Sequence, residues 1–359
     1  MQEHSTQKIN TFSIGFEEIN YNESEYARKV AERLGTNHTA WIVTPEQCLD
    51  VIQSLPDIYD EPFSDSSQIP TLVLSRLTHS KVTVALSGDG GDELFSGYTR
   101  YEWAGRLWNL IDMFPVSLRP ALAKLLQLVP YHLWNVFGRF LSSLMGQSLN
   151  LHNLGARIEK AIYYFSAANQ TELYDRILSH WFETNTILHT EQQFTLVDAG
   201  SAKQSNIHEY MLWHDLTHYL PDDILTKVDR ASMATSLETR APYLDHELIE
   251  LVESFPSSVV QNSNNPKIIL RNILKKYLPS ELFERPKMGF AVPLDSWLRS
   301  ELKDLMHDLL NPSLIRQQGI FDSATIEKTV QQHLSKRRNF QYQIWDLISF
   351  QLWYKRWMS

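Results

Sequence analysis

The sequence predicts an α/β fold in its first third, with a short parallel sheet, and a mostly helical remainder. Two observations predict it. Strand-like and helix-like segments alternate up to about residue 100, which is typical of parallel βαβ units. After about Tyr101, Trp, Leu, Phe and Arg recur at helical spacing with few strand signals.

The individual elements of the first third follow from local patterns. Residues 9–16 form a β-branched and aromatic run that indicates a buried strand. Asn22 can cap a helix together with Glu25, the apolar side chains of that helix share one face, and Gly35 ends it. A strand over residues 38–44, helices over 45–55 and 69–78, and a third strand over 81–86 follow. The third strand is apolar enough to be covered on both faces.

Three regions result: an α/β part over residues 1–100, a helical insertion over 101–206 and a helical part over 207–359. Three strands are few for a self-sufficient sheet.

Composition excludes several classes of protein. The 359 residues carry a formal net charge of −9, which argues against coating nucleic acid. Charged residues and a proline interrupt the most apolar stretch, 122–145, so it falls short of a membrane span. Cys48 is the only cysteine, which excludes a disulfide framework and favours a reducing, cytoplasmic setting.

The segment SGDGGDE, from Ser87 to Glu93, follows the third strand, and ligands of open α/β sheets bind at the carboxyl ends of the strands. It does not match a Walker A loop, a dinucleotide fingerprint, an EF-hand or a nucleophile elbow. On its own it fits equally well a tight turn whose acids cap the next helix.

Four further clusters change this balance. Residues 60–71 form a Pro-bounded run of acids and hydroxyls, and residues 222–245 a dense alternation of charged and apolar residues. Residues 265–279 form an amphipathic helix with Lys267 at its start, and residues 284–293 a Pro- and Gly-bounded loop.

Together these segments resemble the synthetase domain of glutamine-dependent asparagine synthetases and their relatives. SGDGGDELFSGY and the downstream pattern LxKxDRxSMxxSLExRxPxLD carry the resemblance, which runs from about Ile9 to Trp297 and is weak between 101 and 206. It implies an incomplete core of the adenine-nucleotide alpha-hydrolase (PP-loop) type. It also implies an activity in which ATP adenylates a carboxylate, such as aspartate, and ammonia then displaces AMP.

The resemblance assigns roles to individual nucleotide-binding residues. Ile14 corresponds to the residue that packs on adenine, and Ser87 and Gly88 to nucleotide contacts. Asp92 corresponds to the carboxylate that holds Mg²⁺ on the pyrophosphate, a task that suits a hard oxygen ligand.

Four further residues are implied to be catalytic. Asp89 takes the place of an acid that organises the ammonia step, and Lys287 that of a lysine that neutralises charge on the α-phosphate. Arg230 stands where some members have an active-site lysine, and Glu238 lies in the same pattern. Compared with that lysine, arginine keeps the positive charge but carries it on a planar group of different geometry.

Structural explanations compete with these roles. Asp89 and Asp92 can instead cap helices, and Lys287 can form a surface ion pair. Salt bridges with a purely structural role explain Asp60, Asp65, Lys227 and Asp229 equally well. His214 and His218 have a zinc-like spacing, but a polar helix face explains them better.

Two parts of the family pattern have no counterpart in the sequence. The N-terminal glutaminase domain is missing, and so is the pyrophosphate-binding loop Ser-Gly-Gly-x-Asp-Ser that should follow a strand upstream of Ile9. We therefore expect a truncated or split enzyme completed by a separate glutaminase and loop-bearing piece, or a non-catalytic remnant or partner subunit. The acceptor stays open between aspartate, sugar acids and peptide carboxylates.

Overall fold

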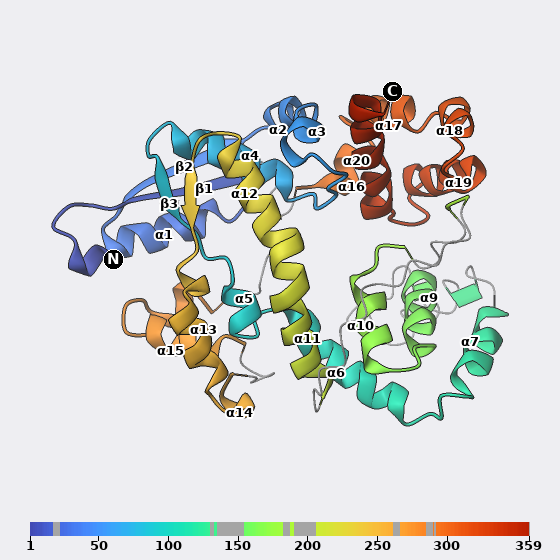
Figure 1. The fold of residues 1–359 in the computed structure, drawn as a ribbon, viewed down its shortest axis with the longest axis horizontal. Helices are drawn as coiled ribbons and strands as arrows, with labels where there is room; N and C mark the ends of the chain where they lie inside the picture. Colours follow the sequence, from blue (N-terminus) through green and yellow to red (C-terminus); the bar gives the residue numbers. More distant parts are fainter. Residues whose placement is uncertain are drawn as a thin grey trace. The chain divides into compact units, whose positions relative to one another are not determined.

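The computed structural model describes residues 1–16, 22–129, 133–134, 154–181, 187–189, 206–260, 266–284, 290 and 292–358. The chain forms two compact units (Figure 1). Unit 1 comprises Met1–Thr99, Leu212–Leu314 and Gln341–Ser359, and unit 2 comprises Arg100–Met211 and Ile315–Phe340. Residues 315–340, which the sequence analysis assigned to the C-terminal part, group with unit 2.

Unit 1 holds all the named strands of the described residues and most of the helices. In chain order its elements are η1 (Gln2–His4), β1 (Asn10–Phe16), α1 (Ser24–Leu34), β2 (Asn37–Val43), α2 (Pro45–Ile52), α3 (Leu55–Tyr59), α4 (Gln68–His79), β3 (Val84–Leu86), α5 (Gly91–Leu94), the π-helix η4 (Asp215–Leu225), α12 (Thr226–Met233), β4 (Glu238–Arg240), η5 (Pro242–Leu244), α13 (His246–Glu253), α14 (Ser257–Val260), α15 (Ile268–Leu274), η6 (Ser280–Leu282), α16 (Leu294–Trp297), α17 (Lys303–Leu309) and α20 (Gln341–Trp357).

The named elements of unit 2 are helical. They are α7 (Arg119–Gln127), α9 (Leu154–Phe165), α10 (Gln170–Leu178), α19 (Ser323–Leu334) and, apart from its first residue, α6 (Thr99–Asp112), while α11 (Ile207–His214) and α18 (Pro312–Gln318) cross the boundaries between the units.

The first two strands confirm the sequence prediction. β1 and β2 pair in parallel, and the rings of Phe12 and Trp41 stack across the pair at 5.8 Å. Gly35 ends the intervening helix with a φ of 72°, as expected of a left-handed C-terminal residue. The predicted cap was wrong, because Asn22 Oδ1 accepts hydrogen bonds from the Ser24 backbone and hydroxyl and thus forms a local turn before the helix.

The third strand differs from the prediction in two ways. β3 pairs in parallel with β4, a strand that the sequence analysis did not find, so the described strands form two two-stranded sheets. Val84 and Leu86 are 41% and 49% exposed, so β3 is not covered on both faces. β4 consists of Glu-Thr-Arg and lacks the apolar run by which a buried strand is recognised.

Helix α4 packs between the first sheet of unit 1 and two neighbouring helices. It packs against β1, against α2 and against α12, the helix that precedes β4. Ile69 and Leu72 on α4 are fully buried. At the C-terminus, α20 packs against α3 and α17, and Trp353 Nε1 donates a 2.8 Å hydrogen bond to the carbonyl of Asp60.

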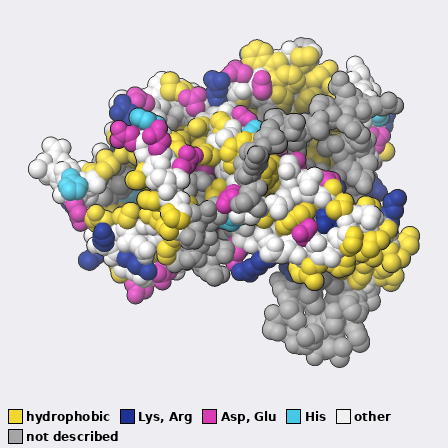
Figure 2. Space-filling view, turned by 60° about the horizontal axis from the view of Figure 1, so that its bottom comes forward, with side chains coloured by type: hydrophobic (Ala, Val, Ile, Leu, Met, Phe, Trp, Pro, Cys, Tyr) yellow, Lys and Arg dark blue, Asp and Glu magenta, His cyan; other side chains and the backbone are white. Residues whose placement is uncertain are grey.

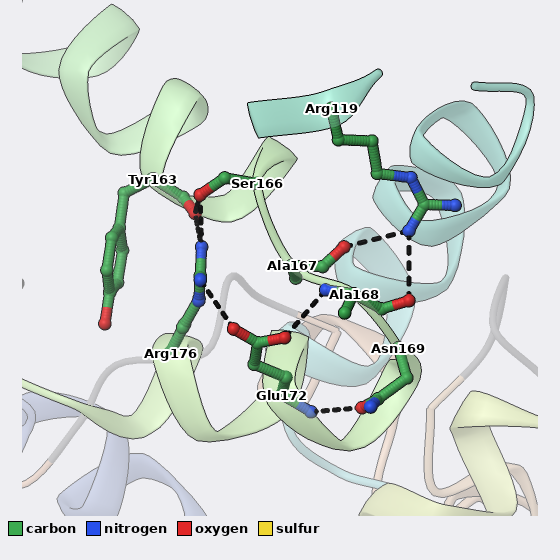
Figure 3. Close-up of polar contacts among 8 residues, drawn as sticks. All are labelled: Arg119, Tyr163, Ser166, Ala167, Ala168, Asn169, Glu172 and Arg176. Carbon is green, nitrogen blue, oxygen red and sulfur yellow. Dashed lines mark hydrogen bonds and ion pairs between the residues drawn. The ribbon is translucent and has the colours of Figure 1, made fainter. Parts of the chain in front are cut away.

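Two arginines hold the helices of unit 2 together (Figure 3). Arg119 is 2% exposed and donates from Nη1 to the carbonyls of Ala167 at 2.8 Å and Ala168 at 3.3 Å. Arg176 donates to the Tyr163 carbonyl and forms a 2.6 Å ion pair with Glu172. Both guanidinium groups therefore satisfy backbone oxygens around the end of α9 and the start of α10.

The surface of the protein mixes apolar and charged side chains, and Figure 2 shows hydrophobic areas next to charged groups on one face. In unit 2, large apolar side chains of α6, α7 and the segment between them are exposed. They are Trp103, Leu110, Met113, Phe114, Val116, Leu118, Leu125 and Leu126. None of the helices in the described part is both long and apolar enough to span a bilayer.

The conformation of Gly90 gives a direct stability prediction. Its φ is +84°, and a Cβ atom would lie 2.3 Å from Leu244 Cδ2, so Gly90→Ala adds both backbone strain and a clash. We expect a loss of about 2–3 kcal/mol in the free energy of unfolding, measured by urea denaturation.

The control is Gly88→Ala. No heavy atom lies within 4 Å of a Cβ added at Gly88, so the loss there should stay below about 1 kcal/mol. Equal losses at the two glycines would contradict the structure of this turn.

Candidate functional site

The segment from Ser87 to Glu93 lies between β3 and α5. The Ser87 amide donates a 2.9 Å hydrogen bond to the Arg240 carbonyl, which fixes the start of the loop to the end of β4. Gly91 N bonds to Gly88 O at 3.3 Å and closes a turn that leads into α5. The loop therefore occupies the carboxyl ends of two parallel strands, where α/β folds bind ligands.

The first half of the loop leaves polar groups available to a ligand. Ser87 Oγ is buried and has no hydrogen-bond partner among the described residues. Gly88 is exposed with open space at its Cβ position, and Asp89 is partly exposed. Because an unpaired buried hydroxyl is unfavourable, Ser87 Oγ is a candidate ligand contact.

Asp92 lies beside a lysine that the sequence analysis did not pair with it. Lys267 Nζ is 3.1 Å from Asp92 Oδ1, and the two side chains are 31% and 25% exposed. The Lys267 amide donates to the Phe95 carbonyl at 3.1 Å, and its φ of 55° lies in the left-handed region. The lysine is thus fixed at the start of α15 by the backbone that follows α5.

Gly97 allows this ion pair to form. A Cβ atom at Gly97 would lie 1.9 Å from Asp92 Oδ1 and 2.2 Å from Lys267 Cε, so only glycine leaves room for both side chains. The motif SGDGGDELFSGY therefore contains one glycine whose function is to admit the Asp92–Lys267 pair.

A second acid in the motif, Glu93, is enclosed. It is 3% exposed, and Tyr98 Oη donates a 2.5 Å hydrogen bond to Glu93 Oε1. Burial raises the pKa of Glu93, the Tyr98 hydroxyl opposes this effect, and the Asp92 and Asp215 carboxylates raise the pKa further. Glu93 is therefore poised to hold a proton more readily than an exposed glutamate.

A buried charge cluster joins the segment just before α4 to α12. Lys227 Nζ is 2.6 Å from Asp65 Oδ2, and Tyr59 Oη donates to the Lys227 carbonyl at 3.2 Å. Burial acts to raise the pKa of Asp65, but the Lys227 ammonium and the hydrogen bonds from Ser67 outweigh it, so the pKa is lowered. Lys227 is 8% exposed and is held by this carboxylate.

Asp223 completes the cluster and was not a candidate in the sequence analysis. Burial is the main cause that raises its pKa to about 7, and the Asp65 carboxylate acts in the same direction. The Lys227 ammonium and the Tyr219 hydroxyl oppose this effect. Asp223 Oδ1 is buried without a hydrogen-bond partner in the described part of the chain, which disfavours its charged form.

The remaining candidate residues lie in several places in unit 1. Ile14 is buried at 6% exposure in β1, opposite Trp41. Glu238 lies on β4 opposite Val84, is exposed and accepts a 2.7 Å hydrogen bond from Arg240 Nε. Arg230 is exposed on α12. Lys287 lies outside the described residues, so its role stays a prediction.

The two histidines with zinc-like spacing do not form a metal site in the described part of the chain. The His214 and His218 rings stack at 5.0 Å, and His214 Nδ1 is 3.7 Å from the buried carboxylate of Asp215. No group of three or more potential ligands is found among the described residues.

Fold and site together define an α/β protein with an acidic, glycine-containing loop at the strand ends and a helical annex. Residues 1–355 match the asparagine synthase family, and the chain belongs to that family. The family resemblance predicted from about Ile9 to Trp297 is thereby confirmed, and the match extends beyond those bounds on both sides.

Several curated proteins are similar to the chain. A putative glutamine-hydrolyzing asparagine synthetase of Mycobacterium tuberculosis is 30% identical over 353 residues, which cover 97% of this chain and 50% of the relative. Glutamine-hydrolyzing asparagine synthetase 1 of Bacillus subtilis is 25% identical over 346 residues, 96% of this chain and 52% of the relative. An amidase of Penicillium rubens, chyE, is 22% identical over 349 residues, 91% of this chain and 50% of the relative. The chain spans about half the length of these relatives.

The raised pKa of Asp223 predicts a pH dependence of stability. At pH values between the ordinary aspartate pKa and about 7, Asp223 keeps its proton in the folded chain and loses it in the unfolded chain. The folded state therefore loses stability as the pH rises through this range. Asp223→Asn removes this titration. We expect the variant to gain about 1–3 kcal/mol relative to the wild type between pH 5 and pH 8 in urea unfolding.

The matched control is Asp229→Asn, on the exposed side of α12. Its stability relative to the wild type should change little over the same pH range. A flat difference for Asp223→Asn would show that Asp223 is ionised in the folded protein throughout this range. The lowered pKa of Asp65 acts at lower pH, where protonation removes its stabilising charge, so the two effects separate.

Proposed function

We propose that the chain is the synthetase part of an ATP-dependent amide-forming ligase. In this reaction a carboxylate attacks the α-phosphorus of ATP and forms an acyl adenylate with loss of pyrophosphate; ammonia then attacks the acyl carbon and releases AMP. The observation that carries the proposal is the loop from Ser87 to Glu93, with its unpaired buried hydroxyl and its Asp92–Lys267 pair, at the strand ends of a member of the asparagine synthase family.

The residues present fit a nucleotide with magnesium. Asp92 supplies a hard oxygen ligand for Mg²⁺, and the adjacent Lys267 ammonium offers a partner for a phosphate oxygen. Ser87 Oγ needs a hydrogen-bond partner, and Gly88 leaves space for one to approach. Bound Mg²⁺ supplies charge neutralisation on the phosphates.

The acid and base assignments follow from exposure and charge. Asp89 lies on the partly exposed side of the loop, where a carboxylate can attract ammonium and accept a proton from it. On the resemblance alone, we assign charge neutralisation at the α-phosphate to Lys287 and catalytic roles in the same site to Arg230 and Glu238. Ile14 is proposed to pack on adenine on the same basis.

The acceptor is proposed to be a small carboxylate such as aspartate, or a sugar-acid or peptide carboxylate. Lys227, which contacts the segment 60–71 at Asp65, is already paired with that carboxylate and is not a free partner for a second one. Ammonia and the pyrophosphate-binding loop are proposed to come from a separately supplied glutaminase and loop-bearing piece.

The test is carboxylate-dependent exchange of labelled pyrophosphate into ATP, with aspartate, glutamate, uronic acids and short peptides as acceptors. Because the pyrophosphate-binding loop is proposed to come from a separate piece, the chain alone should show exchange close to background. Robust exchange by the chain alone would refute the need for a second piece.

MgATP binding to the chain alone separates the nucleotide site from the reaction. Asp92→Asn should weaken Mg²⁺-dependent binding of a fluorescent ATP analogue about tenfold, because it removes a charged oxygen ligand. Asp57→Asn is the matched control, since Asp57 also forms an ion pair in unit 1, with Arg356. Equal binding by the wild type and Asp92→Asn would contradict the proposed metal ligand.

A further inference from the structure

Helix α7 in unit 2 has its polar and apolar faces reversed. Its buried residues are Arg119 and Ala123, and Arg119 is held in the interior by two backbone carbonyls between α9 and α10 (Figure 3). Its solvent face carries leucines, of which Leu125 is 61% and Leu126 39% exposed. Because a surface helix normally turns its apolar side chains toward the core, the leucines of α7 lack the cover that such side chains usually have.

The exposed apolar surface continues on both sides of α7. In Figure 1, α6, the segment after it and α7 follow one another along the edge of unit 2. Single exposed leucines are ordinary, but more than a third of the large apolar side chains exposed in the described residues lie between 110 and 133. We call them the α6–α7 patch: Leu110, Met113, Phe114, Val116, Leu118, Leu125, Leu126, Leu128, Val129 and Leu133.

The sequence around the patch is free of acids. Residues 113–158 contain four Lys or Arg residues and neither Asp nor Glu. At the frequency of acids in the whole chain, 42 in 359 residues, a stretch of this length would hold about five. A chain with a formal net charge of −9 therefore carries its apolar patch in a locally basic stretch.

The acids that bound this stretch are each balanced by an arginine. Asp112 Oδ1 is 3.4 Å from Arg119 Nη2, and Glu159 Oε2 is 2.6 Å from Arg338 Nη2. Lys124 is exposed on α7, next to Leu125. The patch thus combines apolar side chains with a surrounding charge that does not repel an anionic partner.

These two properties restrict the kind of partner. Nucleic acid is bound by clustered Lys and Arg, which a surface of leucines does not offer. A symmetric contact between two copies of the chain would place one acid-free surface against another, with no carboxylate to face Lys124. A lipid bilayer provides both an apolar interior and anionic headgroups at its surface.

We propose that the α6–α7 patch docks unit 2 on the surface of an anionic lipid bilayer. The apolar side chains lie at the boundary between headgroups and acyl chains, and Lys124 lies among the headgroups. The nine residues of α7 rise about 14 Å, less than half of a hydrocarbon core of about 30 Å, so the helix lies on the membrane and does not cross it. The docking does not depend on the proposed ligase activity.

Sedimentation of the full chain with sucrose-loaded vesicles measures the docking. The vesicles are phosphatidylcholine with about one third phosphatidylglycerol, and vesicles of pure phosphatidylcholine serve for comparison. We expect saturable binding to the anionic vesicles, weaker binding to the neutral ones, and a loss of this difference at high salt, because salt screens the headgroup charge.

Two matched pairs of substitutions test the apolar part. Met113→Gln combined with Leu125→Gln removes two exposed apolar side chains from the patch, and Leu251→Gln combined with Ile273→Gln removes two exposed ones from unit 1. The first pair should weaken binding at least about tenfold, and the second should leave it within about twofold. Equal urea midpoints of the two variants show that both are folded. Equal losses of binding would contradict the docking surface.

Lys124→Glu tests the electrostatic part. It places a carboxylate in the acid-free stretch and should weaken binding to the anionic vesicles about fivefold or more, while binding to the neutral vesicles stays within about twofold. Equal effects on the two kinds of vesicle would contradict the placement of Lys124 among the headgroups.

A fluorescent label locates the bound surface. Cys48 is the only cysteine and is buried, so Met113→Cys can be labelled selectively with an environment-sensitive dye. Vesicles should shift the emission of the dye to the blue and quench it when they carry doxyl-labelled lipid, whereas a label at Leu251→Cys should not respond. The proposal is overturned by the absence of saturable binding, by equal responses of the two labels, or by a dimer in lipid-free solution that the Met113 and Leu125 substitutions abolish.

Discussion

The ion pair between Lys227 and Asp65 is the contact on which the arrangement of unit 1 depends. It joins residues 162 positions apart in the chain at 2.6 Å, with side chains that are only 10% and 24% exposed. Two charges withdrawn from water to this extent are stable only while they stay paired. The pair fixes α12 on the segment that leads into α4. Because α12 leads into β4 and β4 holds Ser87 through the Arg240 carbonyl, the position of the acidic loop follows from this contact.

The loop itself resolves an apparent conflict between glycines that suit phosphate and acids that repel it. The acids are not equivalent, since Glu93 is enclosed and bonded to Tyr98, Asp92 is balanced by Lys267, and Asp89 alone stays partly exposed without a partner in the described chain. Burial and a neighbouring ammonium thus remove most of the negative charge from the surface that a nucleotide would meet. The same motif can then approach phosphate through its glycines and a metal through one carboxylate.

Local signals in the sequence were sufficient for β1, β2 and the end of α1 at Gly35, because the β-branched and aromatic composition of a strand and a left-handed glycine depend on neighbouring residues only. β4 was missed, because its three polar residues become a strand only by pairing with β3 across the fold. The partnership of Asp92 with Lys267 and the burial of Asp223 were missed for the same reason. Gly97, by contrast, was visible in the motif, but its role required knowing which side chains meet beside it.

A double-mutant cycle on the Asp65–Lys227 pair tests the central claim most directly. In the Asp223→Asn background, so that no second carboxylate can replace Asp65, urea unfolding is measured for Asp65→Leu, Lys227→Met and both together. Each single change leaves a buried charge unpaired and should cost about 3–5 kcal/mol, whereas the double change should cost far less than their sum, with a coupling of about 2 kcal/mol or more. Additivity within about 0.5 kcal/mol would show that the two charges do not depend on each other and would contradict the account.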